Sequence, residues 1–344
     1  MTPYRIALLG LGSVGRAVAE RLLSDGDLLA ARAGGRPLEL SAIAVRDQAR
    51  LDGLRLPQGT IVASDPASLM SSYDVDAVVE LMGGLAPAGD LIRQSLEGGV
   101  AVVTGNKAVL AERGAELEAV ARASGSPLRF EASVAGGTPV LSVIAEDLAT
   151  MEIERIRGVV NGTTNWILDL IEHEGMSAEE ALAAARNAGY TEADPRLDTE
   201  GHDAAQKLVI LGRLAFGRWI EPDSVERVAS EPPGAGGAGI TKVTDEEVRW
   251  ASEHGKRVRL VAEVASTDGR IEARVLPRFL EHDDPLAEAK GITNVLEIEG
   301  PPQGRIVISG PGAGGPAAAA VVLADLIRLA RGGGSAWAGL PPAS

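Results

Sequence analysis

The feature that most limits the fold of this chain is a glycine-rich turn between an apolar run and a helical pattern. Tyr4–Leu9 has no polar alternation, as expected for a parallel strand buried on both faces. It leads into Gly10-Leu11-Gly12-Ser13-Val14-Gly15 and then into a helical repeat that includes Val18 and Leu22. A strand, a GxGxxG turn and a helix in this order are typical of a dinucleotide-binding Rossmann domain.

Each glycine of this turn has a distinct expected role. Gly10 permits the tight turn, Gly12 lets the backbone approach a pyrophosphate, and Gly15 lets helix and strand pack closely. The helix N-terminus then faces the phosphates. The sequence therefore predicts a site for NAD or NADP, in preference to a glycine-rich turn without a ligand.

The choice between the two cofactors depends on the end of the second strand. Leu40–Val45 reads as that strand, and Arg46 and Asp47 follow it. Arg46 can grip a 2′-phosphate, whereas Asp47 can bind a 2′-hydroxyl. We favour tighter binding of NADP because Arg46 comes first, and the alternative is that Arg46 is simply solvated.

Three later turns are expected at the same ligand edge. Asp76–Leu81 is a buried strand that ends in Met82-Gly83-Gly84, where a ligand can approach the backbone. Val100–Val103 is the next strand, and Lys107 falls in the first turn of the helix after it, where the dipole disfavours a cation. Lys107 is thus either a functional residue or a solvated lysine. Gly310–Gly315, which includes Gly314, precedes an apolar helix at Ala317–Leu329 and is expected to return to the cofactor.

A second candidate site lies in the stretch Gly189–Phe216. Five acidic residues and a lysine lie close together in it, namely Glu192, Asp194, Asp198, Glu200, Asp203 and Lys207. We expect a loop followed by a helix with Asp198 as its N-cap, which puts Asp203 and Lys207 on one side. A surface ion pair is the alternative. A polar site is favoured because the helix turns apolar and because Gly201 is a weak helix former in its first turn.

The remaining pattern predicts a second domain of mixed helices and strands. Arg129–Val134 reads as a strand, and a helix at Val140–Leu148 leaves the first domain. Ile156–Val160 reads as another strand, and Asn161-Gly162-Thr163-Thr164-Asn165 after it caps a helix. Further along we expect a flexible or functional loop at Glu231–Gly239, a hairpin of Val258–Val264 with Ile271–Leu276, and strands at Val295–Ile298 and Arg305–Ile308.

Composition excludes several classes of protein. The 344 residues exceed one typical domain, and a net charge of −15 argues against nucleic-acid and anionic-membrane partners. No apolar stretch approaches the length that a bilayer needs, and the N-terminus lacks a signal-peptide layout. The absence of cysteine excludes disulfides, thiolate zinc sites and cysteine nucleophiles, and it fits a cytoplasmic enzyme.

Five motifs, in order and spacing, resemble those of the homoserine dehydrogenase family. They are Val79-Glu80-Leu81-Met82-Gly83-Gly84, the run from Glu131 to Gly137, Asn161-Gly162-Thr163-Thr164-Asn165, the run from Gly189 to Pro195, and Asp198-x-x-Gly201-x-Asp203-x-x-x-Lys207. The resemblance extends from about residue 4 to about residue 330.

The resemblance implies a fold and an activity. The activity is the NAD(P)-dependent interconversion of L-homoserine and L-aspartate 4-semialdehyde, on the branch towards threonine, methionine and isoleucine. The fold is an α/β Rossmann-type domain, 1–138 with 309–331, and an α+β substrate and dimerisation domain with a mixed sheet, 139–308. A homodimer is implied, and we expect residues 332–344 to be a disordered tail.

The resemblance also implies roles for single residues. Lys207 matches the general acid/base that acts on the C4 oxygen, and Lys107 matches a lysine near the nicotinamide and the substrate. Substrate contacts are implied at Glu192, Asp203, Asp198, Tyr190, Thr163 and Gly162. Cofactor contacts are expected at Gly10, Leu11, Gly12, Ser13, Val14, Gly15, Arg46, Met82, Gly83, Lys107 and Gly314. A monovalent cation, usually sodium, is implied on oxygens, mostly backbone, of Glu131, Val134, Gly136 and Thr138.

The chain departs from the family pattern at three points. Gly105 stands where alanine is commoner, and Ala317 stands where threonine is usual, so a hydroxyl contact to the cofactor is lost. The sequence stops soon after Leu329, so inhibition through an ACT-type or kinase domain is not expected.

Two other functions remain open at this stage. An amino-acid dehydrogenase would show ammonia-dependent turnover, and a Rossmann-type sensor would bind NAD(P) without turnover. Aspartate semialdehyde dehydrogenase requires a cysteine nucleophile, which this chain lacks.

Overall fold

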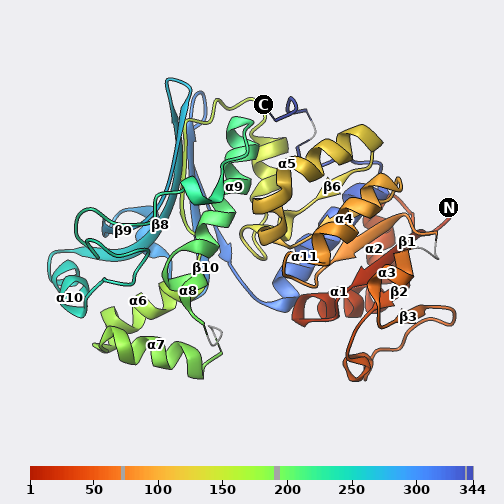
Figure 1. Ribbon diagram of the computed structural model, residues 1–344, viewed down its shortest axis with the longest axis horizontal. Coiled ribbons are helices and arrows are strands. Elements are labelled where there is room, and N and C mark those ends of the chain that lie inside the picture. The colour runs from red at the N-terminus through yellow and green to blue at the C-terminus, as the bar shows by residue number, and fades with distance from the viewer. Residues whose placement is uncertain (71–73, 190–193, 338, 344) are drawn as a thin grey trace. The chain divides into compact units, whose positions relative to one another are not determined.

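The computed structural model describes residues 1–70, 74–189, 194–337 and 339–343 (Figure 1). The chain divides into two compact units, which are Met1–Asp147 with Gly314–Ser344, and Leu148–Ala313. The divisions fall after residues 147 and 313, against predicted boundaries after 138 and 308, and the C-terminal segment returns to the first unit.

The first unit is built on a parallel sheet with the strand order β3-β2-β1-β4-β5-β6. Every pairing in it is parallel, as the Rossmann prediction requires. The strands are β1 Tyr4–Leu9, β2 Leu38–Ala44, β3 Ile61–Ala63, β4 Ala77–Glu80, β5 Ala101–Thr104 and β6 Leu128–Arg129. Strand order reverses between β1 and β4, and ligands of such sheets bind at the carboxyl ends of the strands at this point.

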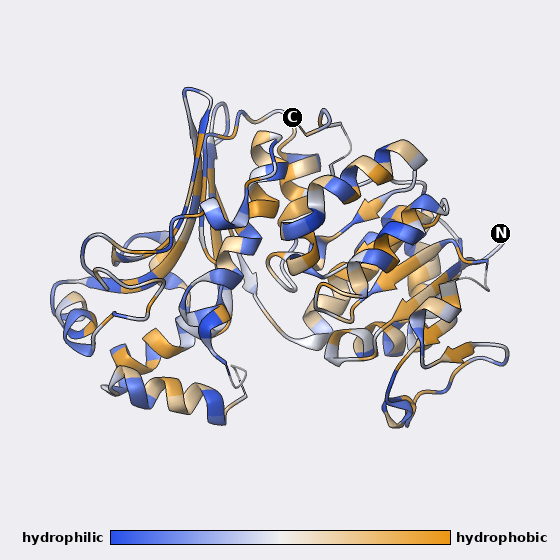
Figure 2. Ribbon diagram, viewed as in Figure 1, coloured by the Kyte–Doolittle hydropathy of each residue, from blue (hydrophilic) through white to orange (hydrophobic). Residues whose placement is uncertain are grey.

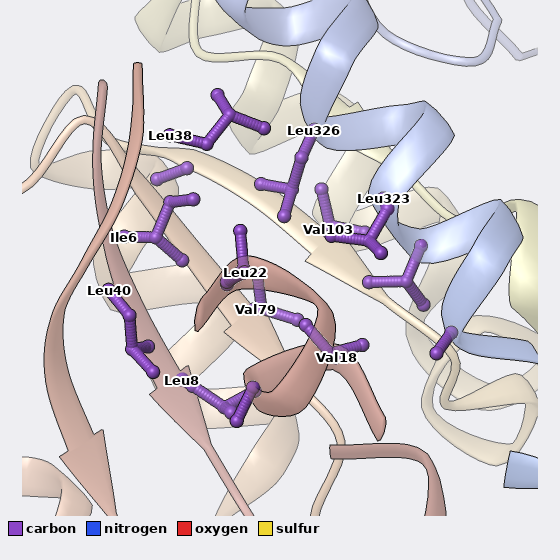
Figure 3. Packing of buried hydrophobic residues seen from close by; sticks show 14 of the residues in the cluster. Ile6, Leu8, Val18, Leu22, Leu38, Leu40, Val79, Val103, Leu323 and Leu326 are labelled. Carbon is purple, nitrogen blue, oxygen red and sulfur yellow. The ribbon is translucent and has the colours of Figure 1, made fainter. Parts of the chain in front are cut away.

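Apolar side chains explain why these segments form the sheet. The strands are coloured as hydrophobic almost throughout in Figure 2, which fits burial on both faces. Figure 3 shows the core cluster in which β1, α1 and α11 meet through Ile6, Leu8, Val18, Leu22, Leu323 and Leu326. Full burial of one such side chain contributes about 1.5–3 kcal/mol, so this cluster dominates the stability of the unit.

Three helices of the first unit, Gly26–Arg32, Pro66–Met70 and Ala88–Glu97, were not predicted from the sequence. The helices of the unit are α1 Ser13–Ser24, α2 Gly26–Arg32, α3 Pro66–Met70, α4 Ala88–Glu97, α5 Lys107–Ser124 and α11 Gly315–Ala330. The connection after α1, which the sequence presents as unusually long, contains α2. Helix α5 begins at Lys107, as predicted, and the Asn106 side chain caps it.

The predicted strand Arg129–Val134 is wrong beyond its first residue. The strand ends at Arg129, and Glu131–Ser133 forms a 3-10 turn. The reason is the buried Glu131 carboxylate, which accepts the backbone N–H groups of Val140, Leu141 and Ser142 at 2.7, 2.7 and 2.8 Å. This carboxylate caps the next helix, whose segment Val143–Asp147 is a π-helix.

The second unit contains a five-stranded sheet with the order β11-β10-β7-β8-β9. Its strands are β7 Arg155–Val159, β8 Lys256–Thr267, β9 Arg270–Glu281, β10 Thr293–Gly300 and β11 Gly304–Pro311. The predicted hairpin is confirmed, since β8 and β9 pair from Thr267↔Arg270 onwards across the two-residue turn Asp268-Gly269. The strands that we expected at the C-terminal end join this sheet as β10 and β11.

The expected mixed sheet needs correction. All four pairings between named strands are antiparallel, and the parallel pairing is an isolated bridge between Glu226 and Arg274. Tight turns explain two of these pairings, β8 with β9 and β10 with β11, because two strands joined by a short turn must run antiparallel.

The helices of the second unit are α6 Gly162–Glu174, α7 Ala178–Asn187, α8 Arg196–Thr199, α9 His202–Phe216 and α10 Asp245–Glu253. Asp198 is not the N-cap of α9, because it lies inside α8 and Gly201 takes the N-cap position. Gly201 has φ +79°, and a Cβ on it would lie 2.9 Å from the Val275 side chain. A left-handed glycine therefore separates the two helices. The glycine- and proline-rich segment after α9 forms turns, and Gly239 packs against the backbone of Thr199.

The C-terminal tail is not disordered as we expected. Trp337 is 2% exposed, and its ring centroid lies 5.4 Å from that of Phe130. Ser335 accepts the Leu128 N–H, and Arg129 donates to the carbonyl of Gly334. The tail therefore continues the packing of the first unit. Among the described residues, no helix has both the length and the apolar character needed to cross a membrane.

We predict that Trp337→Ala destabilises the first unit by about 3–5 kcal/mol, the usual cost of removing a buried aromatic ring. Denaturant unfolding measures the effect. Trp250→Ala is the matched control, because Trp250 is 44% exposed and the loss there should be much smaller. Equal losses of unfolding free energy in the two variants would contradict the packing of the C-terminal tail against the first unit.

Candidate active site

Loops from three adjacent parallel strands meet at the switch point of the first unit. The fingerprint loop Gly10–Gly15 follows β1, Met82–Gly84 follows β4, and Gly105–Asn106 follows β5 and leads to Lys107. Gly315, the first residue of α11, would place a Cβ 2.7 Å from the carbonyl oxygen of Ser13. The second glycine-rich turn, with Gly314 as N-cap of α11, therefore does return to the fingerprint loop.

The structure requires glycine at two of the three fingerprint positions, Gly10 and Gly15. A Cβ on Gly15 would lie 2.1 Å from the Gly10 carbonyl oxygen, and Gly10 itself has φ +97°. Gly12 has an ordinary φ of −71°, and a Cβ there would meet no atom within 4 Å. Neither conformation nor packing requires glycine at position 12, and the approach of a ligand to this residue stays a prediction.

A buried carboxylate fixes the loops after β4 and β5. Glu80 is fully buried, and its Oε1 accepts the backbone N–H of Met82 at 2.7 Å. Its Oε2 accepts the hydroxyl of Thr104 at 2.7 Å, and the Thr104 oxygen accepts the Asn106 N–H at 3.0 Å. This network sets the position of Lys107, the first residue of α5.

Arginines surround the fingerprint loop at the end of β2. Arg46 is exposed and pairs with no other described residue. Asp47 turns aside to cap a 3-10 turn, where its carboxylate accepts the N–H of Ala49 at 3.2 Å. Arg50, which sequence reasoning missed, donates to the carbonyl of Leu11 at 3.3 Å. Arg50 also pairs with Asp47, whose Oδ2 lies 3.9 Å from the Arg50 Nε, so the carboxylate offsets part of the positive charge here.

In the second unit, a lysine is buried where β7 ends. Lys207 is 8% exposed, and its ammonium donates to the Val160 carbonyl at 2.5 Å and to Asp203 Oδ2 at 2.7 Å. Helix α9 supplies both side chains one turn apart, as the sequence predicted. An ammonium has three N–H donors, so one remains beyond these two contacts among the described residues.

Asn161 joins this pair to Asp198. Its amide nitrogen donates to Asp198 Oδ1 at 2.7 Å and to Asp203 Oδ2 at 2.8 Å. The sequence placed Asn161 in a capping turn without assigning it a partner in the site. Gly162 and Thr163 follow it as the first residues of α6, and Gly162 lies against Ile292.

The loop before α8 is described only in part. Tyr190 and Glu192, two of the predicted substrate contacts, lie outside the described residues. At its end, side-chain hydrogen bonds from Arg196 lower the pKa of Asp194 to about 2, with a further contribution from the Arg196 backbone N–H.

The turn from Glu131 to Thr138, where the resemblance implies a cation, offers backbone oxygens as ligands. Because three N–H groups occupy the Glu131 carboxylate, the oxygens left for a cation at Glu131, Val134, Gly136 and Thr138 are mainly carbonyls. Elsewhere, Asp169, Glu172 and His173 approach one another, but the buried guanidinium of Arg259 pairs with both carboxylates. That grouping is an ion-pair network.

Comparison with known proteins decides the family. Residues 139–327 match the family model for homoserine dehydrogenase, and residues 10–131 match the model for its NAD binding domain. The chain belongs to the homoserine dehydrogenase family. It is therefore an oxidoreductase that acts on the CH–OH group of homoserine, with an NAD(P)-binding Rossmann domain.

Relatives and solved structures agree with this assignment. The homoserine dehydrogenase of Corynebacterium glutamicum is 37% identical, over 98% of this chain and 76% of the relative. That of Mycobacterium leprae is 39% identical, over 95% and 72%. A Thiobacillus denitrificans homoserine dehydrogenase superposes with a TM-score of 0.88 at 35% identity, over 96% of this chain and 73% of that chain. A hyperthermophilic archaeal homoserine dehydrogenase in complex with NADPH gives 0.78 at 29% identity, over 95% and 97%.

We predict opposite effects for two glycine variants of the fingerprint loop. Gly12→Ala should fold normally but bind NADP about tenfold or more weakly, because a methyl group blocks the approach of the pyrophosphate. Gly15→Ala should lower the melting temperature, because its Cβ would overlap the Gly10 carbonyl. Calorimetry and cofactor titration separate the two. Normal NADP affinity in Gly12→Ala would rule out the assigned role.

Proposed function

We propose that Lys207 is the general acid/base of homoserine oxidation. The observation that carries this proposal is a buried ammonium fixed by Asp203 and the Val160 carbonyl, with a donor position to spare. A lysine without a substrate role would normally reach solvent, because burying a charge is costly.

L-homoserine and NAD(P)⁺ give L-aspartate 4-semialdehyde, NAD(P)H and one proton. A bound nicotinamide supplies the hydride acceptor for C4. Neutral Lys207 takes the C4 hydroxyl proton as the C–H bond breaks, and in the reverse direction its ammonium returns a proton to the aldehyde oxygen.

The carboxylates near Lys207 suit the amino end of the substrate. Homoserine carries an ammonium group, which a carboxylate binds through charge-assisted hydrogen bonds. Asp198 and Asp203 are proposed for this role together with Glu192, and Gly162, Thr163 and Tyr190 are proposed as the other substrate contacts. Lys107, at the start of α5, is proposed as a second active-site cation on the cofactor side.

We propose NADP as the tighter-binding cofactor. Arg46 follows the end of β2 and is exposed, and Arg50 contacts the fingerprint loop, while Asp47 accepts the Ala49 N–H and pairs with Arg50. A guanidinium can grip the 2′-phosphate that NAD lacks. The remaining cofactor contacts are proposed at the fingerprint loop, Met82, Gly83 and Gly314.

Four further properties rest on the family resemblance. We propose a monovalent cation, sodium, at the Glu131–Thr138 turn, where backbone carbonyls would hold it and so order the turn that begins the next helix. A homodimer, a place in threonine, methionine and isoleucine biosynthesis, and a cytoplasmic location are also proposed. The absence of cysteine in the sequence is consistent with the last of these.

We predict that Lys207→Ala lowers kcat for homoserine oxidation by roughly 10²–10⁴-fold, because the proton acceptor is lost. The NADP dissociation constant should not change, since the first unit is untouched. Lys242→Ala, at an exposed lysine of the second unit, is the control. A variant at position 207 with near-normal turnover would remove Lys207 from the mechanism.

We predict that Arg46→Ala weakens NADP binding by about 1–3 kcal/mol, the scale of a hydrogen bond to a charged group, and changes NAD binding little. Isotherms for both cofactors, with Arg55→Ala as an exposed control, test this. Equal losses of affinity for NADP and NAD would show that Arg46 does not bind the 2′-phosphate of NADP. Dissociation constants and kcat must be reported separately, because a tightly held cofactor leaves slowly.

A further inference from the structure

The Asn161 side chain occupies a fully determined position. It is 5% exposed, and its Oδ1 accepts the backbone N–H of Thr164 at 2.8 Å and the Thr164 hydroxyl at 2.9 Å. Its nitrogen donates to Asp198 and Asp203. All four hydrogen-bonding positions of the amide are therefore used.

These contacts also fix which way the amide points. A flipped amide would turn its oxygen towards two carboxylates and its NH₂ group towards the Thr164 N–H. Both arrangements are repulsive, so the nitrogen must face the acids. Helix α6 thus holds the amide by its first turn and aims two N–H donors at the site.

Without the two N–H groups of Asn161, Asp198 and Asp203 would lose the hydrogen-bond donor that they share. Two carboxylates that converge on one nitrogen atom repel each other, and each N–H group offsets part of that repulsion. Asp203 Oδ2 also accepts from Lys207, whose second contact is the carbonyl of Val160, the neighbour of Asn161. The end of β7 therefore controls both partners of the Lys207–Asp203 pair.

We propose that Asn161 is the positioning residue of this site, which acts through Asp198 and Asp203 to set the location of the Lys207 ammonium. The inference rests on the proposed role of Lys207. It assigns to Asn161 a function beyond capping α6, because a cap uses only the amide oxygen, whereas the site uses the nitrogen.

Two substitutions separate the cap from the positioning role. Asn161→Ser and Asn161→Asp both keep an oxygen that can cap α6, since Ser, Asp and Asn are similarly good N-caps, but both remove the N–H donors. Kinetics with homoserine, the solvent isotope effect on kcat, the NADP dissociation constant and the melting temperature are measured for each. Thr244→Asp is the control for Asn161→Asp, because it adds a charge at the N-cap of α10.

We expect kcat/KM for homoserine to fall about a hundredfold in Asn161→Ser and further in Asn161→Asp, the scale of a displacement of reacting groups by about 1 Å. The solvent isotope effect should rise, because proton transfer to a displaced lysine becomes slower. The melting temperature and NADP affinity should stay close to those of the unmodified protein, and Thr244→Asp should retain its activity.

Retention of kcat/KM within threefold in a folded Asn161→Ser protein would overturn the proposal. A loss of activity that only follows a loss of melting temperature or cofactor affinity, with an unchanged isotope effect, would also overturn it. Lys207→Ala is measured beside these variants. If that variant stays active, the proposed function fails; if it is inactive while both Asn161 variants are normal, only the positioning role fails.

Discussion

The contact on which this account depends is the buried ion pair of Lys207 and Asp203. An ammonium group out of water is costly unless it is paired and hydrogen-bonded, and its neighbours must therefore be fixed as well as close. The structure meets this condition with the last carbonyl before the turn, at Val160, and with the Asn161 amide that holds Asp203. The same arrangement keeps the ammonium near the strand end with one N–H free of these contacts, which is the geometry that proton exchange with a hydroxyl requires.

The first unit also contains buried carboxylates, and hydrogen bonds satisfy them. Glu80 is a buried charge at the end of β4, and backbone N–H groups and the Thr104 hydroxyl satisfy it. The Glu131 carboxylate likewise caps the helix that follows it. In each case a carboxylate at the end of a strand organises the turn beyond it. Glu80 thereby fixes the loops after β4 and β5 beside the point where the strand order of the parallel sheet reverses, the place at which such sheets bind nucleotides.

Periodicity and turn chemistry were enough to predict β1, α1 and the β8–β9 hairpin from the sequence, because residues close together in the chain carry the signals for these elements. The failures have tertiary causes. A strand was expected through Glu131, but the carboxylate binds N–H groups nine to eleven residues later. Disorder was expected around Trp337, whose partner Phe130 is distant in sequence. Lys207 and Asp203 could be paired from their spacing, whereas the link through Asn161 to Asp198 spans 37 residues and has no local signal beyond a capping motif.

The most direct test of the central claim is a crystal structure with homoserine and an oxidised cofactor analogue that cannot accept hydride. The distance to measure joins Lys207 Nζ and the C4 hydroxyl oxygen of homoserine. The account predicts about 2.6–3.2 Å, the range for a general base and its proton donor, with the contacts to Asp203 and Val160 retained. A homoserine hydroxyl bound to another group, with Lys207 still enclosed by Asp203 and Val160 and out of its reach, would contradict the account.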